Sequence, residues 1–148
     1  MACTNTNNLK NCATKTVQTA YNNTAQPFTA NNITINILGT NICDTGCSAS
    51  TQTTGFKVLK SGVYRISYDI TATATAIGTI TAQLYRDTVA LPCAIATVTS
   101  AADASYQIHL ETEIYISTCC NIQPTFSAQI GGVAGEVTHV CANITKLI

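Results

Sequence analysis

The feature that most constrains this chain is an alternation of apolar and polar residues with a period of two, which recurs along most of its length. β-Branched residues dominate the alternating stretches, and their stiff side chains pack well on a pleated sheet. Because successive side chains of a strand point to opposite faces, each stretch predicts a strand with one buried face. The stretches are residues 33–37, 64–72, 80–84, 106–110, 114–116, 126–130 and 140–144.

Residues typical of turns separate these stretches. They are Ser61-Gly62, Arg86-Asp87, the segment from Asn121 to Pro124, and Gly131-Gly132. No segment shows the 3.6-residue periodicity of an amphipathic helix. About eight to ten short strands, each with one apolar face, predict an all-β fold of the antiparallel β-sandwich type.

Two segments lack the alternation. Residues 1–14 are rich in Asn, Thr and Lys and carry Cys3 and Cys12, so we interpret them as an N-terminal arm. Residues 15–148 then form one sandwich domain, without an internal repeat. The segment from Gly39 to Thr54 is also irregular, and its length predicts a functional or crosslinked loop.

The balance of charge excludes several classes of function. Seven basic and seven acidic residues make up 9% of the 148-residue chain, against roughly 25% in a typical soluble domain. Binding to a phosphate backbone requires clustered positive charge, which the sequence lacks, so we expect no nucleic-acid partner. No apolar run approaches the roughly 20 residues of a membrane span, so we expect no membrane insertion.

Eight cysteines are a high number for a chain of this length, and such density is typical of an oxidising environment. The N-terminus nevertheless has no apolar core of a secretory signal. One hypothesis that satisfies both observations is a protein assembled in a cytosol and then released by lysis, as virions and bacterial spores are. The alternative is a mature chain whose signal has been removed.

Disulfides are the favoured role of the cysteines. Cys43 and Cys47 could close a small loop, and Cys119 or Cys120 could meet Cys141 or Cys93 across the end of the sandwich. Cys3 and Cys12, on the arm, suit intersubunit or anchoring bonds. A structural zinc site is less favoured, since the sequence has no C-x-x-C motif and two histidines. Several cysteines could instead be buried and reduced, as small hydrophobic residues.

The sequence gives little support for an enzyme. It contains no nucleophile elbow, P-loop, H-E-x-x-H or dinucleotide fingerprint. His109 alternates with Ile108 and Leu110 and is expected on the outward face of its strand. Glu111 and Glu113 share a strand face or a turn and could be read as paired carboxylates, but acidic residues at a corner between strands are usually solvated. We therefore expect no catalytic residue, no cofactor and no bound metal.

Three motifs in residues 54–148 carry a resemblance to a known family. Gly55–Tyr68 (GFKVLKSGVYRISY) is similar to its central hairpin, Thr79–Val89 (TITAQLYRDTV) to the next strand-turn-strand, and Glu111–Ile116 (ETEIYI) to a later strand. The chain resembles the TNF-like superfamily, which includes complement globular heads and the heads of bacterial collagen-like spore-surface glycoproteins. Phage head-fibre and decoration proteins are of the same type. Thr88 stands where the family has a turn glycine, and Glu111-Thr112 stands where it has Gly-Asp. Calcium and receptor-binding residues are therefore not carried over.

The resemblance implies a ten-stranded jelly roll that assembles as a compact homotrimer. Family trimers bury aromatic and aliphatic side chains around a three-fold axis, and Tyr is enriched at interfaces. The tyrosines could equally fill or rim the sandwich of a single chain. The predicted trimer-interface residues are Tyr64, Tyr68, Tyr106 and Tyr115.

These observations favour a non-enzymatic structural protein of a virion surface. The hypothesis is a trimeric bacteriophage capsid decoration or head-fibre-type protein, attached through its N-terminal arm to a capsid or other particle surface protein. One alternative is a structural protein of a spore surface or cell appendage. Another is a secreted module of the complement-head type that binds a glycan or a protein.

Overall fold

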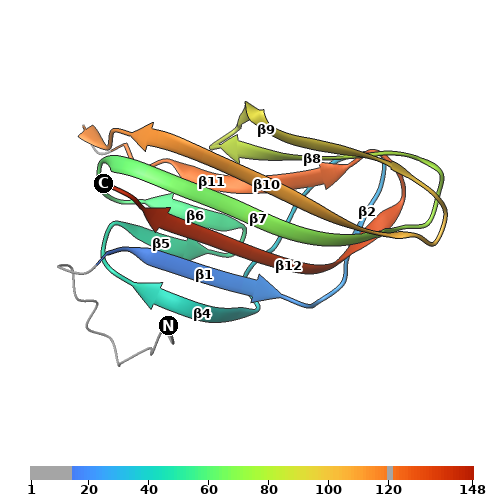
Figure 1. Cartoon of the computed structure of the whole chain (residues 1–148), viewed down its shortest axis with the longest axis horizontal. Helices are drawn as coiled ribbons and strands as arrows, with labels where there is room; N and C mark the ends of the chain where they lie inside the picture. Colours follow the sequence, from blue (N-terminus) through green and yellow to red (C-terminus); the bar gives the residue numbers. More distant parts are fainter. Residues whose placement is uncertain (1–14, 120–121) are drawn as a thin grey trace.

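The computed structural model of the chain describes residues 15–119 and 122–148. Within these residues, twelve strands form two six-stranded antiparallel sheets that pack face to face (Figure 1). This arrangement confirms the predicted all-β sandwich. The described residues contain no helix long and apolar enough to cross a membrane.

The first sheet is built around two long central strands. Its strand order is β10-β7-β12-β1-β4, and β2 pairs with β12 beside β1. The strands are β10 (Ser105–Ile116), β7 (Gly62–Ala74), β12 (Gly135–Lys146), β1 (Val17–Asn22), β4 (Thr40–Thr45) and β2 (Gln26–Phe28).

The second sheet covers the apolar face of the first. Its strand order is β5-β6-β11-β8-β9, and β3 pairs with β11. The strands are β5 (Ala49–Gln52), β6 (Gly55–Val58), β11 (Thr125–Gly131), β8 (Gly78–Arg86), β9 (Val89–Ser100) and β3 (Ile33–Thr34).

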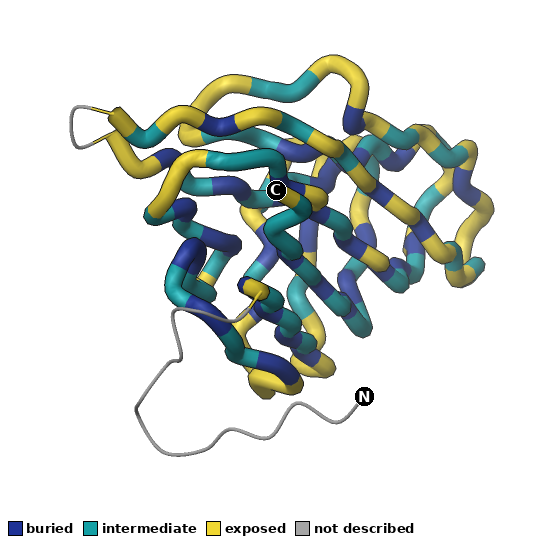
Figure 2. The backbone as a smooth tube through the Cα atoms, turned by 60° about the vertical axis from the view of Figure 1, so that its left-hand side comes forward, coloured by how far each residue is buried: buried dark blue, intermediate teal, exposed yellow. Residues whose placement is uncertain are grey.

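The core lies between the sheets and follows the alternation of the sequence. On β7 the residues with even numbers, from Tyr64 to Ala74, are buried, whereas their odd-numbered neighbours point outward. The same alternation of buried and exposed positions continues along most strands (Figure 2). Each large aliphatic or aromatic side chain buried in this way contributes about 1.5–3 kcal/mol relative to full exposure.

The predicted turn at Arg86-Asp87 is confirmed. Strand β8 ends at Arg86 and β9 begins at Val89, and Asp87 has a φ of 54°. Asp tolerates this left-handed conformation because its short side chain can form local hydrogen bonds. Here Asp87 Oδ1 accepts a hydrogen bond of 3.0 Å from the Thr125 amide of β11. The left-handed position of this turn is thus Asp87 and not Thr88, which stands where the family pattern has its turn glycine.

The prediction of one irregular loop from Gly39 to Thr54 was wrong. This segment contains β4, at the edge of the first sheet, and β5, at the edge of the second. The segment thus crosses from one sheet to the other through the turn around Gly46, which has a φ of 78°. Alternation is weak here because β4 exposes Thr40, Asn41 and Ile42 in succession.

The first described residues lie at one end of the sandwich, beside the C-terminal strand. The Lys146 amide donates a hydrogen bond of 3.0 Å to the Thr16 carbonyl oxygen. Thr45 Oγ1 of β4 donates one of 3.1 Å to the carbonyl oxygen of Lys15. The predicted arm of residues 1–14 lies outside the described residues.

Candidate functional site

The densest group of polar side chains lies on the outward side of the first sheet. We call this side the polar face: the outward, odd-numbered residues of β10 and β7, together with His139, Cys141 and Asn143 of β12. Strand register brings its members together, because His109 of β10 and Cys141 of β12 both pair with Asp69 of β7. Glu113 of β10 pairs with Arg65 of β7 in the same way.

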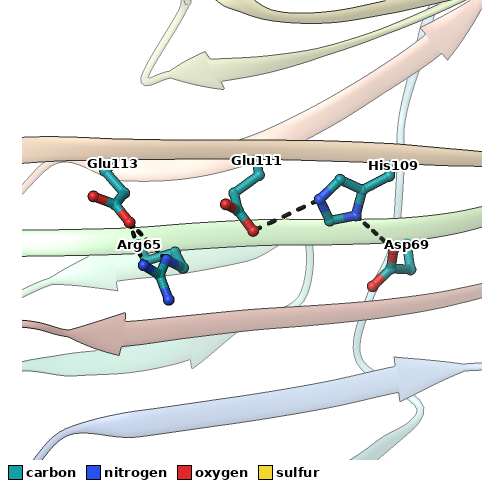
Figure 3. A network of polar contacts seen from close by, with 5 residues as sticks. All are labelled: Arg65, Asp69, His109, Glu111 and Glu113. Carbon is teal, nitrogen blue, oxygen red and sulfur yellow. Dashed lines mark hydrogen bonds and ion pairs between the residues drawn. The ribbon is translucent and has the colours of Figure 1, made fainter.

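His109 lies between two carboxylates (Figure 3). Its Nδ1 is 2.6 Å from Asp69 Oδ1, and its Nε2 is 3.6 Å from Glu111 Oε2. The hydrogen bond to Asp69 is the main cause that raises the pKa of the imidazole above its ordinary value, and the negative charges of Asp69 and Glu111 add to it. More than half of the His109 side chain is exposed, so these contacts are solvated.

Arg65 and Glu113 form a second ion pair on the same two strands (Figure 3). Arg65 Nε donates a hydrogen bond of 2.8 Å to Glu113 Oε1, and Nη2 contacts the same oxygen. This pairing leaves Glu111 without a direct contact to the guanidinium. Both partners are about half exposed, and surface pairs of this kind contribute about 0–1 kcal/mol to stability.

A shallow hollow of about 320 Å³ lies beside His109 on the polar face. Its lining includes Asp69, Thr71, Gln107 and His139. His139 differs from His109 in its partners, because its Nδ1 contacts the amide oxygen of Asn23 and its ring lies 6.1 Å from that of Tyr21. The hollow thus presents two histidines, of which His109 has carboxylate neighbours.

Cys141 and Cys93 are free thiols, so the predicted bridge from Cys119 or Cys120 to either of them is not formed. The geometry of the first sheet explains this for Cys141. Cys141 pairs with Asp69 in the middle of β7, whereas β10 ends at Ile116, which pairs with Gly62. Seven residues of strand span about 23 Å, and a disulfide needs Cα atoms within about 7 Å.

Other predicted disulfide residues have different outcomes. Cys43 is buried on β4, and Cys47 follows the turn at Gly46. Neither is a free thiol, and a bond between the two stays a prediction. Cys3, Cys12 and Cys120 lie outside the described residues.

The structure places three of the four predicted interface tyrosines on inward faces and rules out an interface contact for two of them. Tyr64 and Tyr68 are fully buried between the two sheets, so they cannot contact another subunit. Tyr106 points inward and packs against the core, and its hydroxyl accepts a hydrogen bond of 2.8 Å from the Ala101 amide. Tyr115 is the exception: it lies on the polar face and is 65% exposed.

The sequence predicts His109 on an outward face and Glu111 with Glu113 on one strand face or turn. The structure places all three on the outward face of β10. Sequence reasoning did not identify their partners Asp69 and Arg65, although alternation along β7 places both outward. The missing information is the register between strands that lie 40 residues or more apart in sequence.

The hydrogen-bond partners of the two histidines bear on the chemistry that they could carry out. A histidine oriented by a carboxylate can act as a base for a nucleophile within hydrogen-bonding distance. Among the described residues, neither His109 nor His139 forms a hydrogen bond with a hydroxyl or a thiol. No three His, Cys, Asp or Glu side chains of the described ranges gather closely enough to hold a metal ion by themselves.

Comparisons by sequence find no matching family model and no matching curated protein. Comparisons with solved structures find clear neighbours. The chain is 11% identical to PRD1 vertex protein P5, with a TM-score of 0.63 over 89% of this chain and 73% of that one. It is 11% identical to Eiger TNF from S. frugiperda, with a TM-score of 0.64 over 90% and 93% of the two chains.

A third neighbour is the globular domain of zebrafish complement 1qA protein. The identity is 10%, and the TM-score is 0.63 over 91% of this chain and 98% of that one. At such low identity the likeness concerns the fold alone. The chain therefore has the jelly-roll fold of TNF-like proteins and complement globular heads, as its sequence motifs implied.

Proposed function

We propose that this protein is a non-enzymatic structural component of a virion surface, a trimeric capsid decoration or head-fibre-type protein held by its N-terminal arm. The observation that carries the proposal is the place where the arm begins. Lys15 and Thr16 are tied to Thr45 and Lys146 at one end of the sandwich. An arm that begins there directs this end of the domain toward the particle and leaves the opposite end in solvent.

The fold supports the proposal at a coarser level. PRD1 vertex protein P5, a phage virion protein, has the same fold. The fold therefore suits a structural or binding module on a particle surface. We assign particle recognition to the arm, because the apolar residues of the alternating strands are already buried between the two sheets of the sandwich.

Trimer formation increases the effect of a weak arm. A segment that becomes ordered on its partner loses conformational entropy at that moment, which lowers its affinity. Three arms on one trimer bind together, and such multivalency raises avidity by about 10²–10⁴ without better contacts in any arm. Cys3 and Cys12 would add covalent bonds to the anchor once the particle reaches an oxidising medium.

The test is deletion of residues 2–14. Purified full-length and truncated proteins are compared for mass by light scattering, then for binding to particles from the source that carries the gene. We expect the truncated protein to keep the mass of a trimer, about three times the 15.6 kDa chain, and to lose attachment. A truncated trimer that still occupies the particle fully would contradict the proposal.

The cysteines of the arm have their own variant. A Cys3→Ser, Cys12→Ser double variant should attach at first but dissociate more readily on heating. Its release should not respond to added reductant, whereas release of the unaltered protein should be faster with reductant. Equal reductant sensitivity of the two proteins would remove the covalent part of the proposal.

A binding module is the second candidate, favoured by the similarity to the globular domain of complement 1qA. On this hypothesis the hollow beside His109 or the solvent end of the sandwich would contact a glycan or a protein. A structural protein of a spore surface is the third. The genomic neighbourhood separates these hypotheses, because a major capsid gene would indicate a phage and sporulation genes would indicate a spore.

A further inference from the structure

We infer that the end of the sandwich where the arm begins is a basic docking surface for an acidic patch on a partner protein. The inference rests on the proposed function in so far as that proposal makes the partner a surface protein of the particle. We call this surface the basic end. It consists of the basic side chains that have no ion-pair partner among the described residues: Lys15, Lys57, Lys60, Arg86 and Lys146.

The fold gathers these residues, which are far apart in the sequence. Lys146 is the last residue of β12, Arg86 is the last of β8, and Lys15 directly precedes β1 (Figure 1). Lys60 lies in the turn between β6 and β7, and Lys57 pairs with the first residue of β11. Packed sheets lie about 10 Å apart, so cations from both sheets lie at the same end of the sandwich.

Arg86 and Lys146 continue the inward faces of their strands beyond the core. The inward residues that precede them are buried and apolar: Ala82 and Leu84 on β8, and Ala142 and Ile144 on β12. An unpaired charge resists burial because it would lose its hydration, and both side chains are partly exposed. Lys146 Cε lies so close to Gly62 that a Cβ atom there would be 2.6 Å from it. The two charged groups thus reach solvent past the last apolar layer.

The opposite end of the sandwich has the reverse charge. Among the described residues it carries Asp103, in the turn between β9 and β10, and Glu136, near the start of β12, and no basic side chain. The basic end includes two acidic residues, Asp44 and Asp87, each of which accepts a hydrogen bond from a neighbouring strand. The chain has no net charge, but this separation of charge orients it toward an acidic surface.

The two acidic residues favour a protein partner over a nucleic acid. Duplex DNA carries one negative charge per about 1.7 Å of its axis, so it would place phosphates against Asp44 and Asp87 as well as against the cations. A protein patch can place its carboxylates opposite the cations alone. Such complementarity raises the rate of association and fixes the orientation of the partners, and salt weakens it.

The experiment measures binding of the full-length protein to immobilised poly-L-glutamate by surface plasmon resonance. We expect binding at about 0.1 M NaCl and a loss of at least tenfold at about 1 M, where the screening length falls from about 10 to about 3 Å. Lys60→Gln and Lys146→Gln should each weaken binding by about two- to fivefold, as loss of one solvated ion pair does. The triple variant that adds Arg86→Gln should bind at least tenfold more weakly. Circular dichroism checks folding.

Two control variants separate the basic end from charge elsewhere. Arg65→Gln removes one positive charge, as Lys60→Gln does, but from a side chain of the polar face that is paired with Glu113. Asp103→Asn with Glu136→Gln makes the opposite end neutral and raises the net charge of the chain by two. Both should bind poly-L-glutamate as the unaltered protein does.

Attachment to particles separates this inference from the proposed function. The triple variant keeps the arm, and the protein without residues 2–14 keeps the basic end. If the triple variant attaches as fully as the unaltered protein, the inference is wrong and the role of the arm stands. If the truncated protein attaches and the triple variant does not, the role of the arm is wrong and the inference stands. If the unaltered protein attaches to no particle, the proposed function is wrong and binding to poly-L-glutamate decides the inference.

Three outcomes with poly-L-glutamate contradict the inference. The first is no binding at the lower salt concentration. The second is equal binding by the triple variant and the unaltered protein, or an equal loss in Arg65→Gln and Lys60→Gln. The third is tighter binding to duplex DNA of matched charge, which would make the partner a nucleic acid.

Discussion

At the scale of single residues, the two buried tyrosines of β7 differ in how their hydroxyl groups are satisfied. Tyr64 donates to the carbonyl oxygens of Ser48 and Lys60, at 3.1 and 2.6 Å. The Tyr68 hydroxyl is the one buried side-chain polar atom in the described ranges without a hydrogen-bond partner, and burial raises the pKa of this phenol. Two identical side chains on one strand therefore contribute differently to stability.

This difference gives a matched pair of Phe substitutions. Tyr64→Phe removes the hydroxyl donor from the Lys60 carbonyl oxygen, whereas the Ser48 carbonyl oxygen keeps the Leu59 amide as a donor. The substitution should therefore lower the free energy of unfolding by about 1 kcal/mol. Tyr68→Phe removes an unpaired buried hydroxyl and should be neutral or stabilising by up to about 1 kcal/mol. Urea unfolding at a fixed protein concentration measures both. A larger loss for Tyr68→Phe would contradict the assignment.

The thiols of Cys93 and Cys141 should differ in reactivity for a similar local reason. Cys93 is exposed on β9, whereas burial and the charge of Asp69 raise the pKa of the Cys141 thiol. A raised pKa leaves less thiolate at neutral pH, and the thiolate is the nucleophile. Iodoacetamide should therefore modify Cys141 more slowly than Cys93 at pH 7, with a Cys141 rate that continues to rise at higher pH.

Peptide mapping by mass spectrometry follows the two sites separately. Asp69→Asn removes the charge beside Cys141 and should speed modification of Cys141 without changing that of Cys93. If both thiols of the unaltered protein react at the same rate, the account of Cys141 by burial and by the charge of Asp69 is wrong.

The alternation of the sequence already distinguished the four tyrosines predicted at the interface. Tyr64 and Tyr68 are in phase with Ile66 and Ile70, and Tyr106 is in phase with Ile108, so these three belong to apolar faces. Tyr115 lies between Ile114 and Ile116 and is out of phase. In contrast, the contact between His109 and Asp69 depends on the register of two strands, which periodicity within either strand does not encode.

At the scale of elements, long central strands were predicted well and short edge strands were not. Strand β7 carries eleven residues of regular alternation, from Tyr64 to Ala74, because it pairs on both sides and the opposite sheet buries its inward face. Strands β4 and β5 each lie at the edge of a sheet, where fewer contacts impose a pattern on the side chains. Their sequences therefore look like a loop although their backbones join the two sheets.

The pairing of β6 with β11 depends on a glycine. A Cβ atom at Gly55 would lie 1.7 Å from the carbonyl oxygen of Phe126, whose backbone is fixed because β11 also pairs with β8. At Gly78 the nearest atom is instead a side-chain carbon of Val133, at 2.3 Å. The first clash requires a shift of sheet backbone, whereas the second is relieved by one side chain in a turn.

Gly55→Ala should therefore destabilise the protein more than Gly78→Ala. Overpacking of a well-packed site costs about 1–3 kcal/mol, and we expect Gly55→Ala at or above the upper end of that range. Thermal and urea unfolding of the two variants, at the same protein concentration, provide the measurement. Equal losses would show that the second sheet adjusts its backbone more easily than the pairing suggests.

At the scale of the whole molecule, the polar face of the first sheet is a candidate contact surface for another subunit. The polar face of the first sheet has its charges largely paired, as Arg65 with Glu113 and His109 with Asp69. It also exposes Tyr115 at the end of β10. The core of an interface is typically rich in aromatic side chains and poor in unpaired charges. If another subunit covered this face, Tyr115 would be buried and few unpaired ions would be buried with it.

The last prediction concerns Tyr115 and its control on the other sheet. Tyr115→Ser should weaken the proposed trimer at least tenfold, the effect of losing about 1.4 kcal/mol of binding free energy. Tyr85→Ser, on the outward side of β8 in the second sheet, should leave the trimer intact. Light scattering over a dilution series measures both variants, and circular dichroism checks their folding. Dissociation by Tyr85→Ser but not by Tyr115→Ser would place the second sheet at the interface, because only a side chain buried between subunits weakens the trimer when it is shortened.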